Sequence, residues 1–94
     1  MMKEAEKARV AARLGRIEGQ IRGIRKMVEE DRYCVDVLTQ TRAVVAALRG
    51  VEDLVMKTHL DTCVTDAMKS NDPSAQQEKI VEVMNVVTRF RRYG

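Results

Sequence analysis

The sequence has few aromatic residues, which make up 3% of its 94 residues, and it contains no tryptophan. A core without large rings depends on Leu, Ile, Val, Met and Ala, and this favours a helical bundle over a β-sandwich. Ninety-four residues form one small domain that buries only a limited core by itself. We therefore expect a single all-α domain over residues 1–94 that gains further burial by oligomerising.

Long apolar runs are missing as well. No window approaches the 18 or so apolar residues that a membrane span needs, and the N-terminus MMKEAEKARV has no apolar signal-peptide segment. Together with only two cysteines, this favours a reducing cytosol, so we expect a cytoplasmic protein with no membrane partner.

Motifs for catalysis are also lacking. The sequence has no oxyanion-hole motif, no glycine-rich phosphate loop and no paired acidic constellation. A Cys/His pair could activate a thiolate, but three helices of this size leave little room for a substrate cleft. We expect neither an enzyme nor a small-molecule substrate.

Apolar residues recur at helical spacing in two long segments. The first covers residues 3–30 and has a seam that advances by three or four residues: Val10, Leu14, Ile17, Ile21, Ile24 and Val28. The second covers residues 34–69 and carries a stripe interrupted by polar members: Leu38, Thr41, Val45, Leu48, Glu52, Val55, His59 and Thr62. Gly50 could kink the second helix, and a full break there would let the chain fold back on itself.

A polar boundary separates the second helix from a shorter third one. Asp72 is the expected N-cap, and Pro73 suits the first helical position. The third helix then continues to about Arg92, with one apolar side: Ile80, Val83, Met84, Val87 and Phe90. The chain is predicted to be three helices: long, long and short.

Cys34, His59 and Cys63 are the candidate metal ligands. His59 and Cys63 are four residues apart, which places them on one helix face about 6 Å from each other. On one continuous helix Cys34 would lie roughly 38 to 44 Å from that pair, so a single chain could not gather all three. Two antiparallel copies could, with the twofold axis near residue 47, where the residues are small: Ala43, Ala46 and Ala47. The spacing predicts a homodimer with two equivalent sites.

The donor set indicates which metal would bind. Two thiolates and one imidazole form a soft set that suits three-coordinate Cu(I). Zn(II) would usually take a fourth ligand, which Asp61 or Glu78 could supply. Without a metal, the cysteines would be small buried hydrophobes and His59 an ordinary core or surface histidine.

The first helix carries a basic face. Arg9, Arg13 and Arg16 fall at i, i+4 and i+7, and Gln20 extends the same face. Arginine and glutamine contact DNA phosphates and base edges. The alternative is a solvated helix face, because nearby glutamates dilute the charge and the whole chain carries only +3. No helix-turn-helix pattern is visible, so any DNA contact would use a less familiar surface.

Three glycines form a second stripe on the first helix. Gly15, Gly19 and Gly23 recur every fourth residue, although glycine in a helix costs up to ~1 kcal/mol relative to alanine. The pattern indicates a backbone that comes close either to another helix, the interpretation we favour, or to a nucleic acid.

The motifs RIEGQIRGI (residues 16–24), RYCVDVL (32–38) and HLDTC (59–63) closely resemble the copper-sensing operon repressor (CsoR) family. The likeness covers residues 9–90. Cys34, His59 and Cys63 match the Cys…His-x-x-x-Cys pattern of its copper sensors. Nickel and cobalt sensors resemble this pattern with histidine last, formaldehyde sensors have an acid there, and persulfide sensors lack the histidine.

The resemblance implies an all-helical homodimer that pairs into a homotetramer. Cys34 of one chain and His59 with Cys63 of the other would hold Cu(I), while Tyr33 and a glutamate of the third helix, expected to be Glu78, would form hydrogen bonds around His59. The metal-free protein would bind operator DNA, and Cu(I) would release it and so allow transcription of copper-homeostasis genes. A thiol or persulfide sensor, or a Zn- or Ni-sensing repressor of the same fold, stays open as an alternative.

The resemblance also bears on DNA contacts. Arg13 matches a family position implicated in DNA contact. The family often has a basic residue midway along the second helix, where this chain has Gly50, and the neighbouring Arg49 is expected to take that role.

Overall fold

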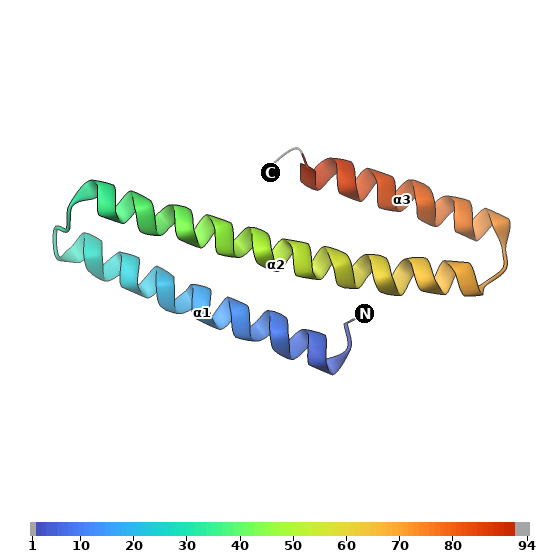
Figure 1. Ribbon diagram of the computed structural model, residues 1–94, viewed down its shortest axis with the longest axis horizontal. Coiled ribbons are helices and arrows are strands. Elements are labelled where there is room, and N and C mark those ends of the chain that lie inside the picture. The colour runs from blue at the N-terminus through green and yellow to red at the C-terminus, as the bar shows by residue number, and fades with distance from the viewer. Residues whose placement is uncertain (1, 92–94) are drawn as a thin grey trace. The chain divides into compact units, whose positions relative to one another are not determined.

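The computed structural model describes residues 2–91 and contains three helices and no strand within that range (Figure 1). Helix α1 spans Glu4–Glu29, α2 spans Cys34–Lys69 and α3 spans Pro73–Arg91. The predicted all-α order of long, long and short helices is confirmed, while Arg92, the predicted end of the third, lies outside the described residues. None of these helices combines the length and apolar character needed to cross a bilayer, as far as residues 2–91 are concerned.

Two compact units divide the chain, and α2 contributes to both. Residues 3–55 contain α1 and the first part of α2. The second unit, which comprises Met2 and residues 56–91 of the described part of the chain, contains the rest of α2 and α3. The candidate metal pair belongs to the second unit and the basic face of α1 to the first.

A tight turn ends α1 and reverses the chain. Asp31 has a left-handed conformation with φ 55°. The Arg32 N–H donates to the Met27 carbonyl at 3.0 Å, and the Asp31 N–H donates to the Val28 carbonyl at 3.2 Å. These two bonds form a Schellman motif, which satisfies carbonyls that the helix end leaves unpaired. The first part of α2 therefore runs back alongside α1 (Figure 1).

The core between α1 and α2 depends on residues spaced by seven. Val10 and Ile17 of α1 are 7% and 5% exposed, and Val44 and Val51 of α2 are both 8% exposed. Because seven residues are close to two helical turns, each pair lies on one face of its helix. The predicted seam of α1 is thus divided: Ile24 is half-buried, and its other three members are 39–59% exposed, namely Leu14, Ile21 and Val28.

The apolar stripe predicted for α2 does not form this core. Leu38, Val45 and Leu48 are 61%, 45% and 40% exposed, because the neighbouring positions Val44 and Val51 pack toward α1 instead. Both sides of this helix are apolar, and α1 covers one of them.

Gly50 does not break α2, which is a single helix from Cys34 to Lys69. The possibility that the chain folds back at this glycine is therefore wrong. Of the three alanines near residue 47, Ala47 is half-buried and faces a groove shared with α1, whereas Ala43 and Ala46 are exposed.

The second unit begins α3 as the sequence predicts. The Ser74 N–H donates to Asp72 Oδ1 at 3.0 Å, so Asp72 is the N-cap, and Pro73 occupies the first helical position. The apolar side of α3 is only partly covered: Val83 and Val87 are half-buried, while three further members are exposed, namely Ile80, Met84 and Phe90.

Candidate metal centre and nucleic-acid interface

His59 and Cys63 lie side by side on α2, as their spacing predicts. Both side chains are half-buried, and the Cys63 Sγ is 3.5 Å from His59 Nδ1. One nitrogen and one sulfur thus face each other within a single helical turn. This is the arrangement that two ligands of a shared metal ion require.

The other ring nitrogen of His59 contacts α3. His59 Nε2 is 3.3 Å from Glu82 Oε1, and the second oxygen of that carboxylate accepts a hydrogen bond from Lys79 Nζ at 2.9 Å. The hydrogen bond with Lys79 is the main cause that lowers the pKa of Glu82, and the hydrogen bond with His59 is the second. The hydrogen bond between Glu82 and Lys79 in turn raises the pKa of Lys79. Glu82 therefore stays ionised near neutral pH and can only accept hydrogen bonds.

The contact with Glu82 indicates which ring nitrogen of His59 carries the hydrogen. Because the Glu82 carboxylate only accepts, His59 Nε2 carries the hydrogen and donates it. In the neutral imidazole the lone pair is then on Nδ1, the nitrogen beside Cys63. A carboxylate that holds the distal nitrogen of a metal-binding histidine fixes both its tautomer and its orientation. The residues present therefore fit a soft metal ion bound at Nδ1 and Sγ.

A pocket of about 350 Å³ opens beside Cys63. Its lining comes from the end of α2 and the start of α3: Cys63, Asp66, Ala67, Ser70, Ala75, Glu78, Lys79 and Glu82. Glu78, the glutamate predicted to lie near His59, is exposed and lines this pocket one turn before Glu82. Glu82, which no sequence pattern indicates, is the glutamate that forms the hydrogen bond to His59.

Cys34 is the first residue of α2, and both it and the preceding Tyr33 are exposed. Neither Cys34 nor Cys63 forms a disulfide. Within residues 2–91 of one chain, no three His, Cys, Asp or Glu side chains form a group that could hold a metal ion.

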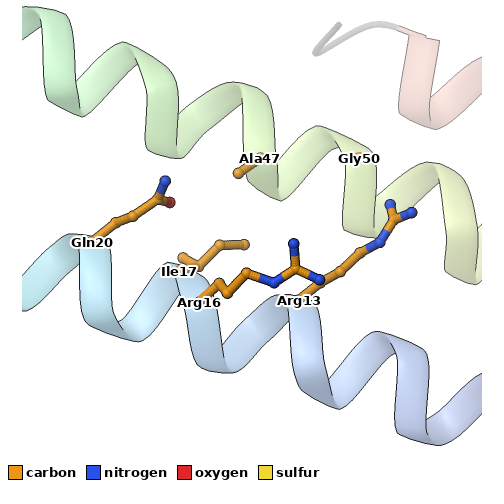
Figure 2. Close-up of a pocket in the computed structure, with 6 residues that line it drawn as sticks. All are labelled: Arg13, Arg16, Ile17, Gln20, Ala47 and Gly50. Carbon is orange, nitrogen blue, oxygen red and sulfur yellow. The ribbon is translucent and has the colours of Figure 1, made fainter.

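A groove of about 320 Å³ lies between α1 and α2 in the first unit. Figure 2 shows its lining, in which Arg13, Arg16, Ile17 and Gln20 come from α1, and Ala47 and Gly50 come from α2. Three of the five residues predicted to contact DNA therefore share one groove. The other two, Arg9 and Arg49, are exposed but are not part of this lining.

Among the residues that the structure describes, no acid forms an ion pair with the arginines of the groove. The ion pairs among residues 2–91 involve Lys7, Lys26, His59 and Lys79, and none includes Arg13 or Arg16. Their two positive charges are available to an anion, with the Gln20 amide beside them.

The glycine stripe of α1 does not contact α2. An added Cβ at Gly15 or Gly23 would meet nothing within 4 Å, and one at Gly19 would meet only an Arg22 side-chain nitrogen at 3.7 Å. These glycines therefore do not serve close packing against α2 of the same chain, and a close approach to a helix of another chain stays a prediction.

The comparisons with known proteins identify the class of this three-helix protein as transcriptional repressors. Residues 6–89 match the family described as metal-sensitive transcriptional repressor, and the chain belongs to that family. It is 46% identical over 87 residues to the copper-sensing transcriptional repressor CsoR of Bacillus subtilis strain 168. The aligned residues make up 93% of this chain and 83% of that relative.

Two solved structures are also similar. The copper-sensing repressor CsoR with Cu(I) from Geobacillus thermodenitrificans NG80-2 superimposes with a TM-score of 0.81 at 37% identity, over 97% of this chain and 92% of that one. The nickel-responsive transcriptional regulator InrS gives a TM-score of 0.76 at 36% identity, over 88% and 90% of the two chains. The all-α three-helix fold predicted from the resemblance is confirmed.

Proposed function

We propose that this protein is a Cu(I)-responsive transcriptional repressor. Without metal it binds operator DNA, and with Cu(I) bound between its chains it releases the operator and derepresses copper-homeostasis genes. The observation that carries the proposal is the pairing of His59 Nδ1 with Cys63 Sγ at 3.5 Å while Glu82 occupies the other ring nitrogen. The similarity to two copper-sensing repressors supports the choice of metal.

Cys34 of one chain, with His59 and Cys63 of another, would supply the ligands. Two thiolates and one imidazole suit Cu(I), which accepts soft ligands and low coordination numbers. Because α2 is unbroken, the 25 residues between Cys34 and His59 keep those two side chains about seven helical turns apart in one chain. The third ligand therefore comes from a second chain.

The exposed apolar face of α2 supports a homodimer. Cys34 lies four residues before Leu38, so both fall on the same helix face, and this face continues through Val45 and Leu48. Side chains of this kind are covered when a second α2 packs against them. The exposed residues of α1, Leu14 and Ile21 among them, leave a further apolar surface for pairing dimers into a homotetramer.

Tyr33 and a glutamate of α3 would orient His59 around the metal. Tyr33 directly precedes Cys34, so it would arrive at the site together with the ligand of the other chain. Glu82 already holds Nε2, and Glu78, one turn away beside Cys63, would interact with the site from the same pocket.

The basic surface of α1 and α2 would contact the operator. Its members are exposed and carry groups that bind phosphates and base edges: Arg9, Arg13, Arg16, Gln20 and Arg49. A dimer or tetramer would repeat this surface, which multiplies a charge that is modest in one chain.

Release of DNA requires metal to favour one arrangement of the chains over another. An effector shifts an equilibrium only by its differential affinity for the two states. Ligands drawn from two chains give such a difference, since the site is complete in only one arrangement. A coupling of about 1–3 kcal/mol changes DNA affinity by roughly 5- to 150-fold.

Nickel or zinc is the second candidate effector, because the nickel-responsive InrS has almost the same structural similarity as the copper sensor. The sulfur of Cys63 at the last ligand position favours Cu(I). A nitrogen or oxygen donor in its place would suit Ni(II) or Zn(II) better. X-ray absorption of the loaded protein separates the two: Cu(I) with two sulfur ligands and one nitrogen is expected.

The proposed function is tested by measuring operator affinity with and without anaerobic Cu(I). We expect about one Cu(I) per chain and at least about a tenfold loss of operator affinity. Equal affinities in the two conditions would contradict the proposal, as would release by Ni(II) or Zn(II) with no response to Cu(I).

Glu82→Gln is expected to weaken Cu(I) binding by about 10-fold, because loss of a partner that orients a metal-binding histidine typically costs 10- to 100-fold. A glutamine amide can still contact Nε2 but no longer fixes which nitrogen carries the proton. Cu(I) affinity is measured by competition with a chelator of known affinity.

Glu78→Gln is the matched comparison, since it makes the same chemical change one turn earlier on α3. We expect a smaller loss there than for Glu82→Gln. A larger effect at Glu78 would mean that Glu78 replaces Glu82 at His59 when the chains assemble.

A further inference from the structure

Lys79 differs from the other lysines of the chain in its surroundings. Of the six lysines it alone is half-buried, whereas the other five are exposed. Its side chain is 31% exposed, against 60% and 76% for Lys7 and Lys26, which also pair with glutamates of their own helix. An exposed ion pair of the latter kind contributes little to a fold. The surroundings of Lys79 indicate instead a side chain that is held in one place.

Glu82 receives a hydrogen bond on each of its two oxygens. Lys79 Nζ lies 2.9 Å from Oε2, and His59 Nε2 lies 3.3 Å from Oε1. The first distance is typical of a charge-assisted hydrogen bond, while the second is slightly longer than most hydrogen bonds. Lys79 is therefore the stronger partner, and the position of the carboxylate depends more on Lys79 than on His59.

Without Lys79, the carboxylate of Glu82 could leave His59. The Glu82 side chain is 43% exposed, so water can compete for both of its oxygens. Glutamate also has three rotatable side-chain bonds, and fixing them costs conformational entropy. One long hydrogen bond to His59 offsets little of that cost. A second bond, from Lys79 to the other oxygen, restricts the carboxylate to one orientation.

We propose that Lys79 is a positioning residue of the metal centre. Its bond to Oε2 holds the Glu82 carboxylate so that Oε1 accepts the hydrogen of His59 Nε2, which leaves the lone pair of Nδ1 beside Cys63. All four residues belong to one compact unit, so this chain of contacts needs no second chain. The inference rests on the proposed function, in which Nδ1 and the sulfur bind Cu(I), and it adds a residue that acts through Glu82 rather than on the metal.

The metal-free protein provides the first test, because His59 is the only histidine in the chain. In protein without a histidine tag, a two-bond proton–nitrogen correlation spectrum shows this one imidazole, and it distinguishes the ring nitrogen that carries hydrogen from the one with a lone pair. At a mildly alkaline pH, where an imidazole is neutral, we expect hydrogen on Nε2 in the unchanged protein. In Lys79→Met the two nitrogen resonances should move toward each other, as in a mixture of tautomers, and Lys79→Arg should restore the original spectrum.

The variants are chosen to keep the fold. Methionine and arginine form helices about as readily as lysine, so each leaves α3 intact, and arginine also keeps the charge and the hydrogen-bond donors. Lys7→Met is the matched control, since Lys7 pairs with Glu4, three residues away on α1, at 3.6 Å. It should leave the His59 spectrum unchanged. Circular dichroism should show the same helical content in every variant.

Cu(I) affinity, measured by chelator competition, is the second readout. Lys79→Met is expected to weaken Cu(I) binding by about fivefold, less than the loss for Glu82→Gln, because Lys79 acts through that carboxylate. In a Glu82→Ala background there is no carboxylate to hold, so Lys79→Met should then change the affinity by less than about twofold. A lysine that merely stabilised α3 would produce the same loss in both backgrounds.

Two results would overturn the inference: a His59 spectrum that is the same in Lys79→Met as in the unchanged protein, or an equal loss of Cu(I) affinity with and without the Glu82 carboxylate. Both leave the repressor function in place. Failure of the unchanged protein to bind Cu(I) would instead reject the proposed function, whereas the spectrum of the metal-free protein would still decide the role of Lys79.

Discussion

Cys63→Ser is expected to weaken Cu(I) binding by more than about 100-fold and to abolish release of the operator. Loss of a mere hydrogen-bond partner of a ligand costs up to about 100-fold, so loss of a ligand itself costs more. Serine keeps the size of the side chain but replaces a soft thiolate by a hard hydroxyl, which binds Cu(I) poorly. Chelator competition under anaerobic conditions measures the affinity.

Cys34→Ser is expected to show the same loss, although it lies 29 residues earlier in the sequence. Both variants should still bind operator DNA within about threefold of the unchanged protein, because neither cysteine lines the groove between α1 and α2. Full Cu(I) affinity in Cys34→Ser would remove Cys34 from the site and leave a two-ligand pair of His59 and Cys63.

The helices and their ends could be predicted because the signals are local. Asp72 and Pro73 act through the backbone groups of the next turn, and Gly50 alone does not offset the helix-forming residues around it. The pairing of His59 with Cys63 is equally local, since it needs only the geometry of one helical turn.

The packing face of α2 could not be predicted, because the helix is apolar on two sides. Val44 and Val45 are chemically identical neighbours, yet the first is 8% exposed and the second 45%. Which of them faces α1 depends on how the two helices are rotated against each other, and periodicity within α2 alone carries no such information. Between residues 38 and 55, the predicted stripe is the face that α1 leaves uncovered.

The glutamate beside His59 could be predicted only to within one helical turn. Glu78 and Glu82 are four residues apart and lie on the same face of α3. Either one therefore matches the expectation of a glutamate on the third helix that forms a hydrogen bond with His59. The axial position of α3 against α2 selects Glu82, and that position depends on the turn at residues 70–72. Similarly, the groove between α1 and α2 takes its lining from both helices, so the pattern of either helix alone does not predict it.

A mixture of Cys34→Ser chains and Cys63→Ser chains is expected to regain Cu(I) binding that neither variant has alone. In a mixed dimer, one site receives an intact Cys34 from the Cys63→Ser chain and intact His59 and Cys63 from the Cys34→Ser chain. The other site has neither cysteine. Because a twofold dimer has two equivalent sites, random exchange of equal amounts should restore about a quarter of the sites of the unchanged protein.

The most direct measurement of the central claim is the number of tight Cu(I) sites in that mixture, with chain exchange verified by co-purification of two different tags. If two chains share each site, tight sites should appear as exchange proceeds and reach about one quarter of the normal number. If exchange is complete and no tight site appears, the three donors do not come from two chains, and the account is contradicted.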